Sequence, residues 1–227
     1  MPHSREKDLE RFYDLLARLP CLPFPAALAV APPQGVYFVF EPGEQRAKGG
    51  LRVTRIGTHG LTPGGRAVLK TRLRQHYGRK TGDGGHHRSS VFRLLTGAAL
   101  ARQAGGDMPA GWGGERPQDT QTQAAEQRLE AEVSTLMARL ELRCLPVADP
   151  PGQQSLRKVL EAGAIALLSN HGRLPIDPPS AGWLGHHSHA ALVRSSGLWN
   201  RDHVQRSPDP SFIATLEAVA AQALQPA

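Results

Sequence analysis

The sequence predicts an α+β domain, and three features support this prediction. Two segments rich in β-branched and aromatic residues, 35–41 and 51–59, flank a turn-rich gap and are typical of an antiparallel hairpin. A short apolar run between turn signals, 142–147, predicts a third strand. Apolar residues recur at helical spacing in further segments, namely 6–18, 69–77, 91–103, 122–140, 152–170 and 211–224. The length of 227 residues fits one domain, 1–227, with additions at both ends.

The hairpin register follows if Glu41 pairs with Leu51 across the gap. Tyr37 then lies opposite Arg55. The face that carries Tyr37 would also carry Val39 and Val53, and the other face Val36, Phe38 and Phe40. A one-residue slip would reverse the faces, so this register is a hypothesis.

The helix predicted at 69–77 places two leucines and two polar side chains on one stripe. Leu69, Arg72, Leu73 and His76 stand at i, i+3, i+4 and i+7. The leucines must face the core. A cation and an imidazole at a core margin are more typical of a functional site than of a solvated helix face.

These residues resemble a known family. Gly35-Val36-Tyr37, then Arg55-Ile56-Gly57, then Arg72 and His76 one turn apart are similar to the GIY-YIG nuclease superfamily, in its restriction-type and related bacterial version. The resemblance implies a small three-stranded antiparallel sheet flanked by helices, and metal-dependent endonuclease cleavage of DNA phosphodiester bonds. It implies a catalytic core at 33–171, an N-terminal helix and connector at 1–32, and an irregular loop and C-terminal helix at 172–227. The motifs are short, so their order and combination carry the resemblance.

The resemblance also implies catalytic roles. Tyr37 would take a proton from the attacking water, directly or with help from His76, and Arg72 would stabilise the developing negative charge. Arg55 stands where the family has its second tyrosine. It could lower the pKa of Tyr37, or it could anchor a phosphate. The alternative for Tyr37 is a strand residue that packs by its ring.

A single carboxylate on a helix after the third strand, followed by an asparagine, completes the family pattern. Glu161 and Asn170 match that order, although their separation is short, and Asn200 is the alternative asparagine. Glu161 would bind Mg²⁺ or Mn²⁺, with waters and the DNA phosphate filling the remaining ligand positions. The other interpretation of Glu161 is a helical salt bridge with Arg157.

Charge points to a polyanionic partner. The net charge is +7, and residues 51–103 hold eleven Lys or Arg against one acidic residue, Asp83, a local net charge of +10. DNA is the first candidate. A compositional bias toward arginine would give the same excess of positive charge in residues 51–103, which we call the basic block. The expected DNA contacts are Arg55, Arg72, Arg74, Arg79, Lys80, His87 and Arg88.

The loop at 80–90 has two interpretations. Its glycines, its arginine and the start of the following helix would suit a phosphate. It could also be a solvated loop that ends in an ordinary helix cap, with Ser89 or Ser90 as the N-cap.

The cysteine count and the lack of long apolar segments restrict the class of protein. Cys21 and Cys144 are too few for a disulfide framework. No apolar run suits a membrane span, and the polar N-terminus does not suit a signal peptide, so we expect a cytoplasmic protein.

The segment 19–34 has five prolines and predicts an extended connector. His186, His187 and His189 could bind zinc, but they have no partner pair at zinc-finger spacing, and a solvated or DNA-facing loop is the other interpretation.

Two rival functions remain at this stage. A non-catalytic nucleic-acid-binding module would keep the fold and the basic face without turnover. A structural interaction protein would show no salt-dependent DNA binding at all.

Overall fold

A computed structural model describes residues 5–63, 65, 67–78, 84–152 and 154–224. Its sheet is antiparallel, with strands in the order β1-β4-β2-β3. The strands are β1 (Leu22–Pro23), β2 (Gly35–Gln45), β3 (Leu51–Gly57) and β4 (Glu141–Pro146). The α+β class is confirmed, but the expected count of three strands was wrong, because the described sheet has four. The additional strand, β1, is a two-residue edge strand, too short to give a periodic signal.

The helices are α1 (Arg5–Ala17), α2 (Phe24–Val30), α3 (Leu69–Tyr77), α4 (Val91–Gln103), α5 (Thr120–Ala138), α6 (Leu156–Leu168), α7 (Ala191–Ser196) and α8 (Phe212–Ala223). Two short 3₁₀ helices, η1 (His87–Ser89) and η2 (Leu184–His187), lie between them. The predicted helices are all present. Among the described residues, none of the helices combines the length and the apolar character needed to span a membrane.

The prediction of an extended connector at 19–34 was wrong, because α2 lies within it. Pro25 is accommodated in the first turn of α2, where a missing backbone N–H removes no helical hydrogen bond. The alanines that follow favour a helix.

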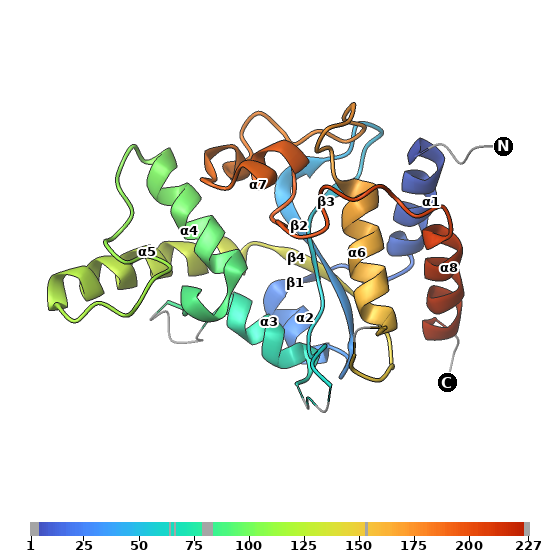
Figure 1. Cartoon of the computed structure of the whole chain (residues 1–227), viewed down its shortest axis with the longest axis horizontal. Coiled ribbons are helices and arrows are strands. Elements are labelled where there is room, and N and C mark those ends of the chain that lie inside the picture. Colours follow the sequence, from blue (N-terminus) through green and yellow to red (C-terminus); the bar gives the residue numbers. More distant parts are fainter. Residues whose placement is uncertain (1–4, 64, 66, 79–83, 153, 225–227) are drawn as a thin grey trace.

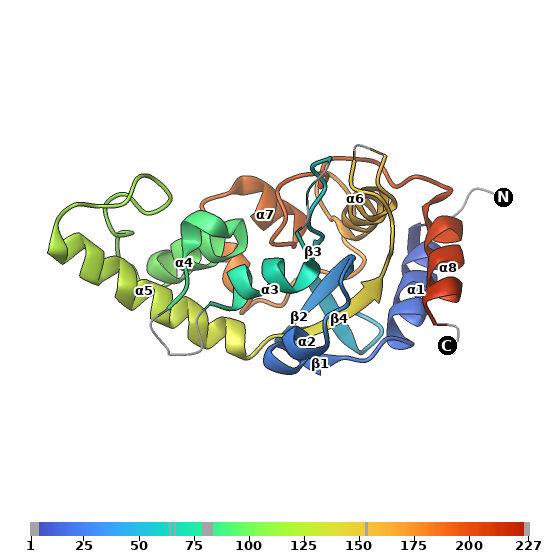
Figure 2. The same cartoon turned by 90° about the horizontal axis from the view of Figure 1, so that it is seen from below.

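The two faces of the sheet carry separate apolar cores, and Figure 1 shows helices on both sides of the sheet. Helices α1, α6 and α8 pack on the face that presents Val36, Phe38 and Phe40. Helices α2, α3, α4 and α5 cover the face that presents Tyr37 and Val39. Figure 2 shows α4 and α5 extending away from the sheet as a helical arm.

The hairpin register differs from the expected one. Tyr37 lies opposite Gly57, and Arg55 lies opposite Val39, a shift of two residues that leaves Tyr37 on its predicted face. An irregularity between Val39 and Phe40 changes the register beyond this point. Val53 therefore packs in the core on the opposite face, contrary to the prediction.

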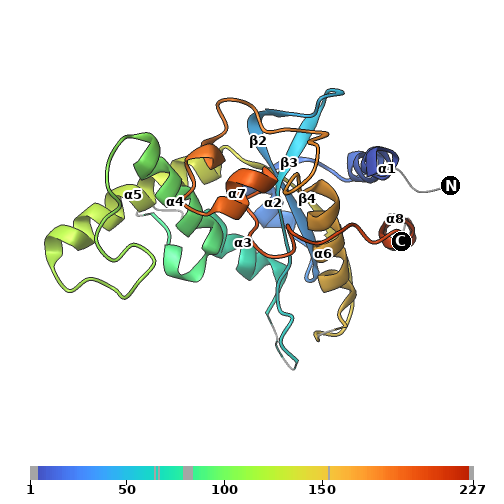
Figure 3. The ribbon, with the colours of Figure 1, turned by 45° about the horizontal axis from the view of Figure 1, so that its top comes forward.

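The outer edge of β3 is covered by the chain that follows α7. The Trp199 amide donates to the Thr54 carbonyl at 2.8 Å. The Asn200 side chain accepts from the Ile56 amide at 3.1 Å and donates to the Ile56 carbonyl at 2.8 Å, as a neighbouring strand would. Figure 3 shows this segment running past α6 on its way to α8. The arrangement brings residues 199–203 to the end of β3.

Candidate active site

Tyr37 and His76 form a buried hydrogen-bonded pair between β2 and α3. The Tyr37 hydroxyl lies 2.7 Å from Nε2 of His76, and each residue is 1% exposed. The predicted helical stripe explains this position, because His76 follows Leu69 and Leu73 into the core. Gly57 leaves the space for the phenol: a Cβ atom there would lie 2.1 Å from the Tyr37 hydroxyl.

His76 is held as a neutral imidazole. Burial lowers its pKa well below the usual value, and the charges of Arg55, Arg72 and Arg93 lower it further. Its second ring nitrogen, Nδ1, lies 2.7 Å from the Ser90 hydroxyl. Ser90 is also the N-cap of α4 and accepts a hydrogen bond from the Arg93 amide at 3.2 Å.

Arg55 and Arg72 approach this pair from β3 and α3. Arg55 donates from Nη1 to the Trp199 carbonyl at 2.6 Å, and its guanidinium carbon lies 4.9 Å from the Phe92 ring centroid. Its Nε is buried without a hydrogen-bond partner in the described part of the chain. Arg72 donates from Nη1 to the Ser89 carbonyl at 3.1 Å. Both arginines are therefore held near the Tyr37–His76 pair.

Two pockets lie beside these residues. One, of about 160 Å³, is lined by Arg55, Arg72 and Glu161 together with the 199–203 segment. The other, of about 350 Å³, is lined by Arg72, Glu161 and residues after β3, including Thr58 and His59. Because Arg72 and Glu161 line both pockets, we treat them as one depression and call it the Arg72–Glu161 groove.

Glu161 projects into this groove from α6. Burial raises its pKa, whereas the charge of Arg55, the Thr58 amide and the charge of Arg72 act in the opposite direction. Asp202, which lines the same pocket, raises the pKa further. The alternative salt bridge was a wrong interpretation, because Arg157 instead pairs with Asp149 and donates to the His59 carbonyl at 2.9 Å.

The model of the GIY-YIG domain family matches residues 3–226 of the chain. The chain belongs to the GIY-YIG family. This confirms the resemblance seen in the sequence, and it extends the match over the N- and C-terminal additions. No curated protein and no solved structure matches the chain. GIY-YIG membership indicates nuclease activity in general, acting on DNA with divalent metal ions.

The two candidate asparagines of this GIY-YIG chain lie in different places. Asn170 follows α6 and accepts from Arg5 at 3.1 Å, and its side-chain amide donates to the Asp177 carbonyl at 3.2 Å. It does not line either pocket of the groove. Asn200 lines the pocket that contains Glu161 while it covers the edge of β3. Of the two, Asn200 is therefore the residue at the groove.

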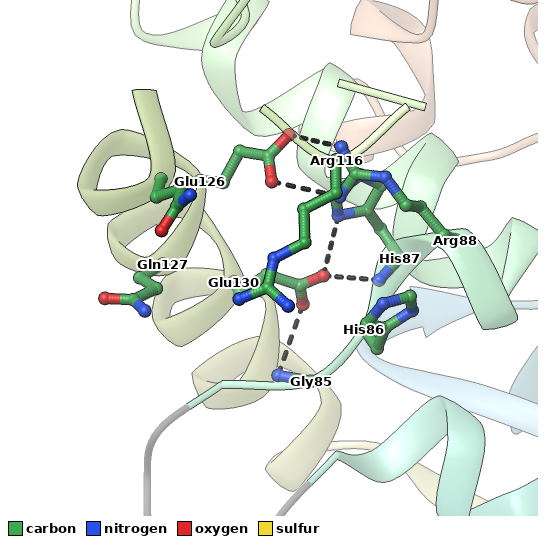
Figure 4. Close-up of a pocket in the computed structure, with 9 residues that line it drawn as sticks. Gly85, His86, His87, Arg88, Arg116, Glu126, Gln127 and Glu130 are labelled. Atoms are coloured by element: carbon green, nitrogen blue, oxygen red, sulfur yellow. Dashed lines mark hydrogen bonds and ion pairs between the residues drawn. The ribbon is translucent and has the colours of Figure 1, made fainter. Parts of the chain in front are cut away.

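His87 and Arg88, two expected DNA contacts, are committed to contacts within the protein (Figure 4). His87 is 3% exposed, stacks on Trp112 at a centroid distance of 3.8 Å, and binds Glu130 at 2.9 Å. Arg88 binds both carboxylate oxygens of Glu126, at 2.7 and 2.9 Å, and the Gly114 carbonyl at 2.7 Å. These contacts connect η1 to α5, so the structure gives no support for His87 or Arg88 as a DNA ligand.

The other expected DNA contacts have mixed outcomes. Arg74 is exposed on α3, whereas Arg79 and Lys80 lie outside the described residues. Several members of the basic block are interior: Arg52 pairs with Glu44 at 2.5 Å, and Arg93 pairs with Glu130 at 2.5 Å. The block is therefore not one continuous basic surface.

Sequence reasoning missed three residues near the site. The sequence predicts only a capping role for Ser90, and no pattern in it points to Asp202 or His203. Among the described residues, His203 is the non-glycine residue with positive φ, at 65°. A positive φ angle is uncommon outside glycine, and no pattern in the sequence predicts it at His203.

The cluster of His186, His187 and His189, two of which lie in η2, gives no support for zinc. His186 contacts the Ser180 carbonyl through Nε2 at 2.9 Å. In the described ranges, no group of three or more His, Cys, Asp or Glu side chains is arranged to hold a metal ion.

Proposed function

We propose that this chain is a metal-dependent DNA endonuclease that hydrolyses phosphodiester bonds in the Arg72–Glu161 groove. One observation carries the proposal: β3, α3 and α6 bring Arg55, Arg72 and Glu161 to one pocket. The charges of the same two arginines lower the pKa of His76, and Nε2 of His76 lies 2.7 Å from the Tyr37 hydroxyl. Two cations and a carboxylate beside a phenol and an imidazole suit the hydrolysis of a phosphate diester.

The groove suits Mg²⁺ or Mn²⁺. Glu161 and Asp202 line one pocket and offer carboxylate oxygens, the donors that these cations prefer. Waters and the DNA phosphate would supply the remaining ligands, because the described residues form no larger ligand cluster. Such an ion, when bound, supplies charge neutralisation at the phosphate and an acidic bound water.

The protein side chains would divide the remaining work. Tyr37 accepts the proton of the attacking water, and Arg55 and Arg72 stabilise negative charge on the phosphate. Tyr37 is 1% exposed and does not line the groove. We therefore propose that DNA binding opens a path for water from the groove to the phenol, while Arg72, which lines the groove, binds the phosphate.

Cleavage of supercoiled plasmid at low salt tests this function. Wild-type protein with Mg²⁺ or Mn²⁺ should nick the plasmid, and chelation should stop the reaction. Glu161→Ala should lower the rate at least about hundredfold. Glu217→Ala is the matched control, because Glu217 lies on α8 and pairs with Arg11 on α1, on the other side of α6.

The alternative functions give different results. Salt-sensitive DNA binding without cleavage would support a non-catalytic binding module. Equal cleavage by wild type and Glu161→Ala would show that Glu161 is not the metal ligand or that a contaminant cuts the plasmid.

A further inference from the structure

Three exposed arginines and an exposed histidine gather around α7, beside the end of α4. Arg102 lies in the last turn of α4, and Arg194 lies in the last turn of α7. Arg201 belongs to the 199–203 segment, and His189 lies between η2 and α7. All four residues are exposed. We call these four residues the α4–α7 patch.

Packing and electrostatics both bring the four residues together. Helices α4 and α7 each pack against η2, and Figures 1 and 3 show α7 beside α4. Partial burial lowers the pKa of His189, and the charges of Arg102, Arg201 and Arg194 lower it further. Such an effect requires the three guanidinium groups to lie near the imidazole, because charge interactions weaken with distance. Segments that are far apart in the sequence therefore form one positively charged surface.

No salt bridge neutralises the α4–α7 patch in the described part of the chain. Its three arginines form no ion pair there, whereas Arg93 of α4 pairs with Glu130. Arg194 donates to the Ser188 carbonyl, a contact that orients the side chain and leaves its charge in place. The neighbouring carboxylate in the sequence, Asp202, lines the groove. A cluster of exposed, unpaired cations attracts a polyanion.

Arg201 joins the patch to the Arg72–Glu161 groove, because it lines the same pocket as Arg55, Arg72 and Glu161. We propose that the α4–α7 patch binds the phosphate backbone of the DNA duplex that lies in the groove, so that one duplex contacts α3, the groove and α7 in turn. The identity of the polyanion rests on the proposed nuclease function. The positions of the patch and of Arg201 come from the fold alone.

This path also bears on the kind of phosphodiester bond that the enzyme cleaves. A duplex bound both by the cations of α3 and by the patch continues beyond the groove in two directions. The groove then receives a bond within the strand and not one at its end. The patch therefore accounts for cleavage by an endonuclease and not by an exonuclease.

Titrations of one labelled duplex in EDTA, over a range of salt concentrations, test the inference without requiring activity. The Arg102→Ala/Arg194→Ala double variant should reduce the slope of log affinity against log salt by about 2, or about 1 for each lost phosphate contact. Arg194→Lys should keep the wild-type slope, because it keeps the charge. Arg18→Ala is the matched control, because this exposed arginine follows α1, which packs on the opposite face of the sheet.

A second double variant tests whether one duplex reaches both α3 and the patch. Arg74→Ala/Arg194→Ala should reduce the slope by the sum of the two single losses, about 2, with no more than one duplex bound per chain.

An unchanged slope in Arg102→Ala/Arg194→Ala would overturn the inference and would leave the patch to an acidic protein partner. More than one duplex bound per chain would also overturn it, because the patch would then be a separate DNA site. Patch-dependent binding by a wild-type protein that cleaves no plasmid would contradict the nuclease proposal alone.

Discussion

Gly57 decides where the Tyr37 phenol lies. It stands opposite Tyr37 in the β2–β3 ladder, and a Cβ atom at this position would lie 2.1 Å from the hydroxyl and 2.3 Å from the ring carbon that bears it. The phenol therefore occupies the volume that any other side chain would need. The glycine of the Arg55-Ile56-Gly57 segment is explained by this close approach and not by a special backbone angle.

Gly57→Ala should displace Tyr37 from His76. We expect a loss of about 1–3 kcal/mol in the free energy of unfolding, the usual range for overpacking, and loss of plasmid cleavage with DNA binding retained. Urea denaturation and cleavage assays measure the two effects. Gly152→Ala is the control, because a Cβ atom there has no neighbour within 4 Å. Full activity of Gly57→Ala would contradict the proposed role of the Tyr37–His76 pair.

At the scale of elements, the sequence was most informative where one segment determined the result. The α3 stripe predicted that His76 enters the core with Leu69 and Leu73, and this is confirmed. Strand alternation correctly separated Tyr37 from Val36 and Phe38. The irregularity after Val39 reversed the face of Val53, and alternation alone does not reveal such an irregularity.

The sequence was least informative where distant segments meet. The 80–90 loop suggested phosphate binding, but η1 instead binds carboxylates of α5, about forty positions later in the chain. Asn200 and Asp202 reach the groove because their segment covers the edge of β3. No local spacing encodes such contacts, and an apolar or polar pattern reports only which face a residue occupies.

Glu130 is the main electrostatic contact between η1, α4 and α5. Burial alone would raise its pKa, but hydrogen bonds from His87 and the charge of Arg93 lower it from 4.5 to about 2. Because the folded-state pKa is the lower one, the carboxylate stabilises the fold above about pH 4.5. This contribution is lost as the pH falls from 4.5 toward 2.

Glu130→Gln should therefore lower the free energy of unfolding by about 3 kcal/mol at neutral pH, since it leaves the buried Arg93 cation without its counter-ion. Urea denaturation at several pH values measures the difference between variant and wild type, which should shrink below pH 4.5. Glu132→Gln, on the exposed side of α5, provides the control. If the difference in the free energy of unfolding between Glu130→Gln and wild type did not depend on pH, the shape of the side chain and not its charge would account for the lost stability.

At the scale of the whole molecule, the net charge of +7 overstates the basic surface. Arg52, Arg88 and Arg93 pair with Glu44, Glu126 and Glu130 inside the protein. The cations available to DNA among the described residues of the basic block centre on α3, where Arg72 lines the groove and Arg74 is exposed. The DNA backbone is therefore expected to follow α3.

Arg74→Ala should weaken DNA binding uniformly across sequences and reduce the slope of log affinity against log salt by about 1, as expected for one lost phosphate contact. Binding titrations over a range of salt concentrations measure this slope. Arg18→Ala, an exposed arginine just beyond α1, should leave it unchanged. Equal slopes for wild type and Arg74→Ala would place the DNA elsewhere.

The central claim is that Tyr37 from β2 and Glu161 from α6 act in one hydrolytic site, and a double-mutant cycle tests it most directly. Single-turnover plasmid cleavage would be compared for wild type, Tyr37→Phe, Glu161→Gln and the double variant. We predict that each single change lowers the rate at least about hundredfold and that the double variant is no slower than the slower single variant, because both disable the same step. Fully multiplicative losses, or an unchanged rate in Tyr37→Phe, would contradict the account.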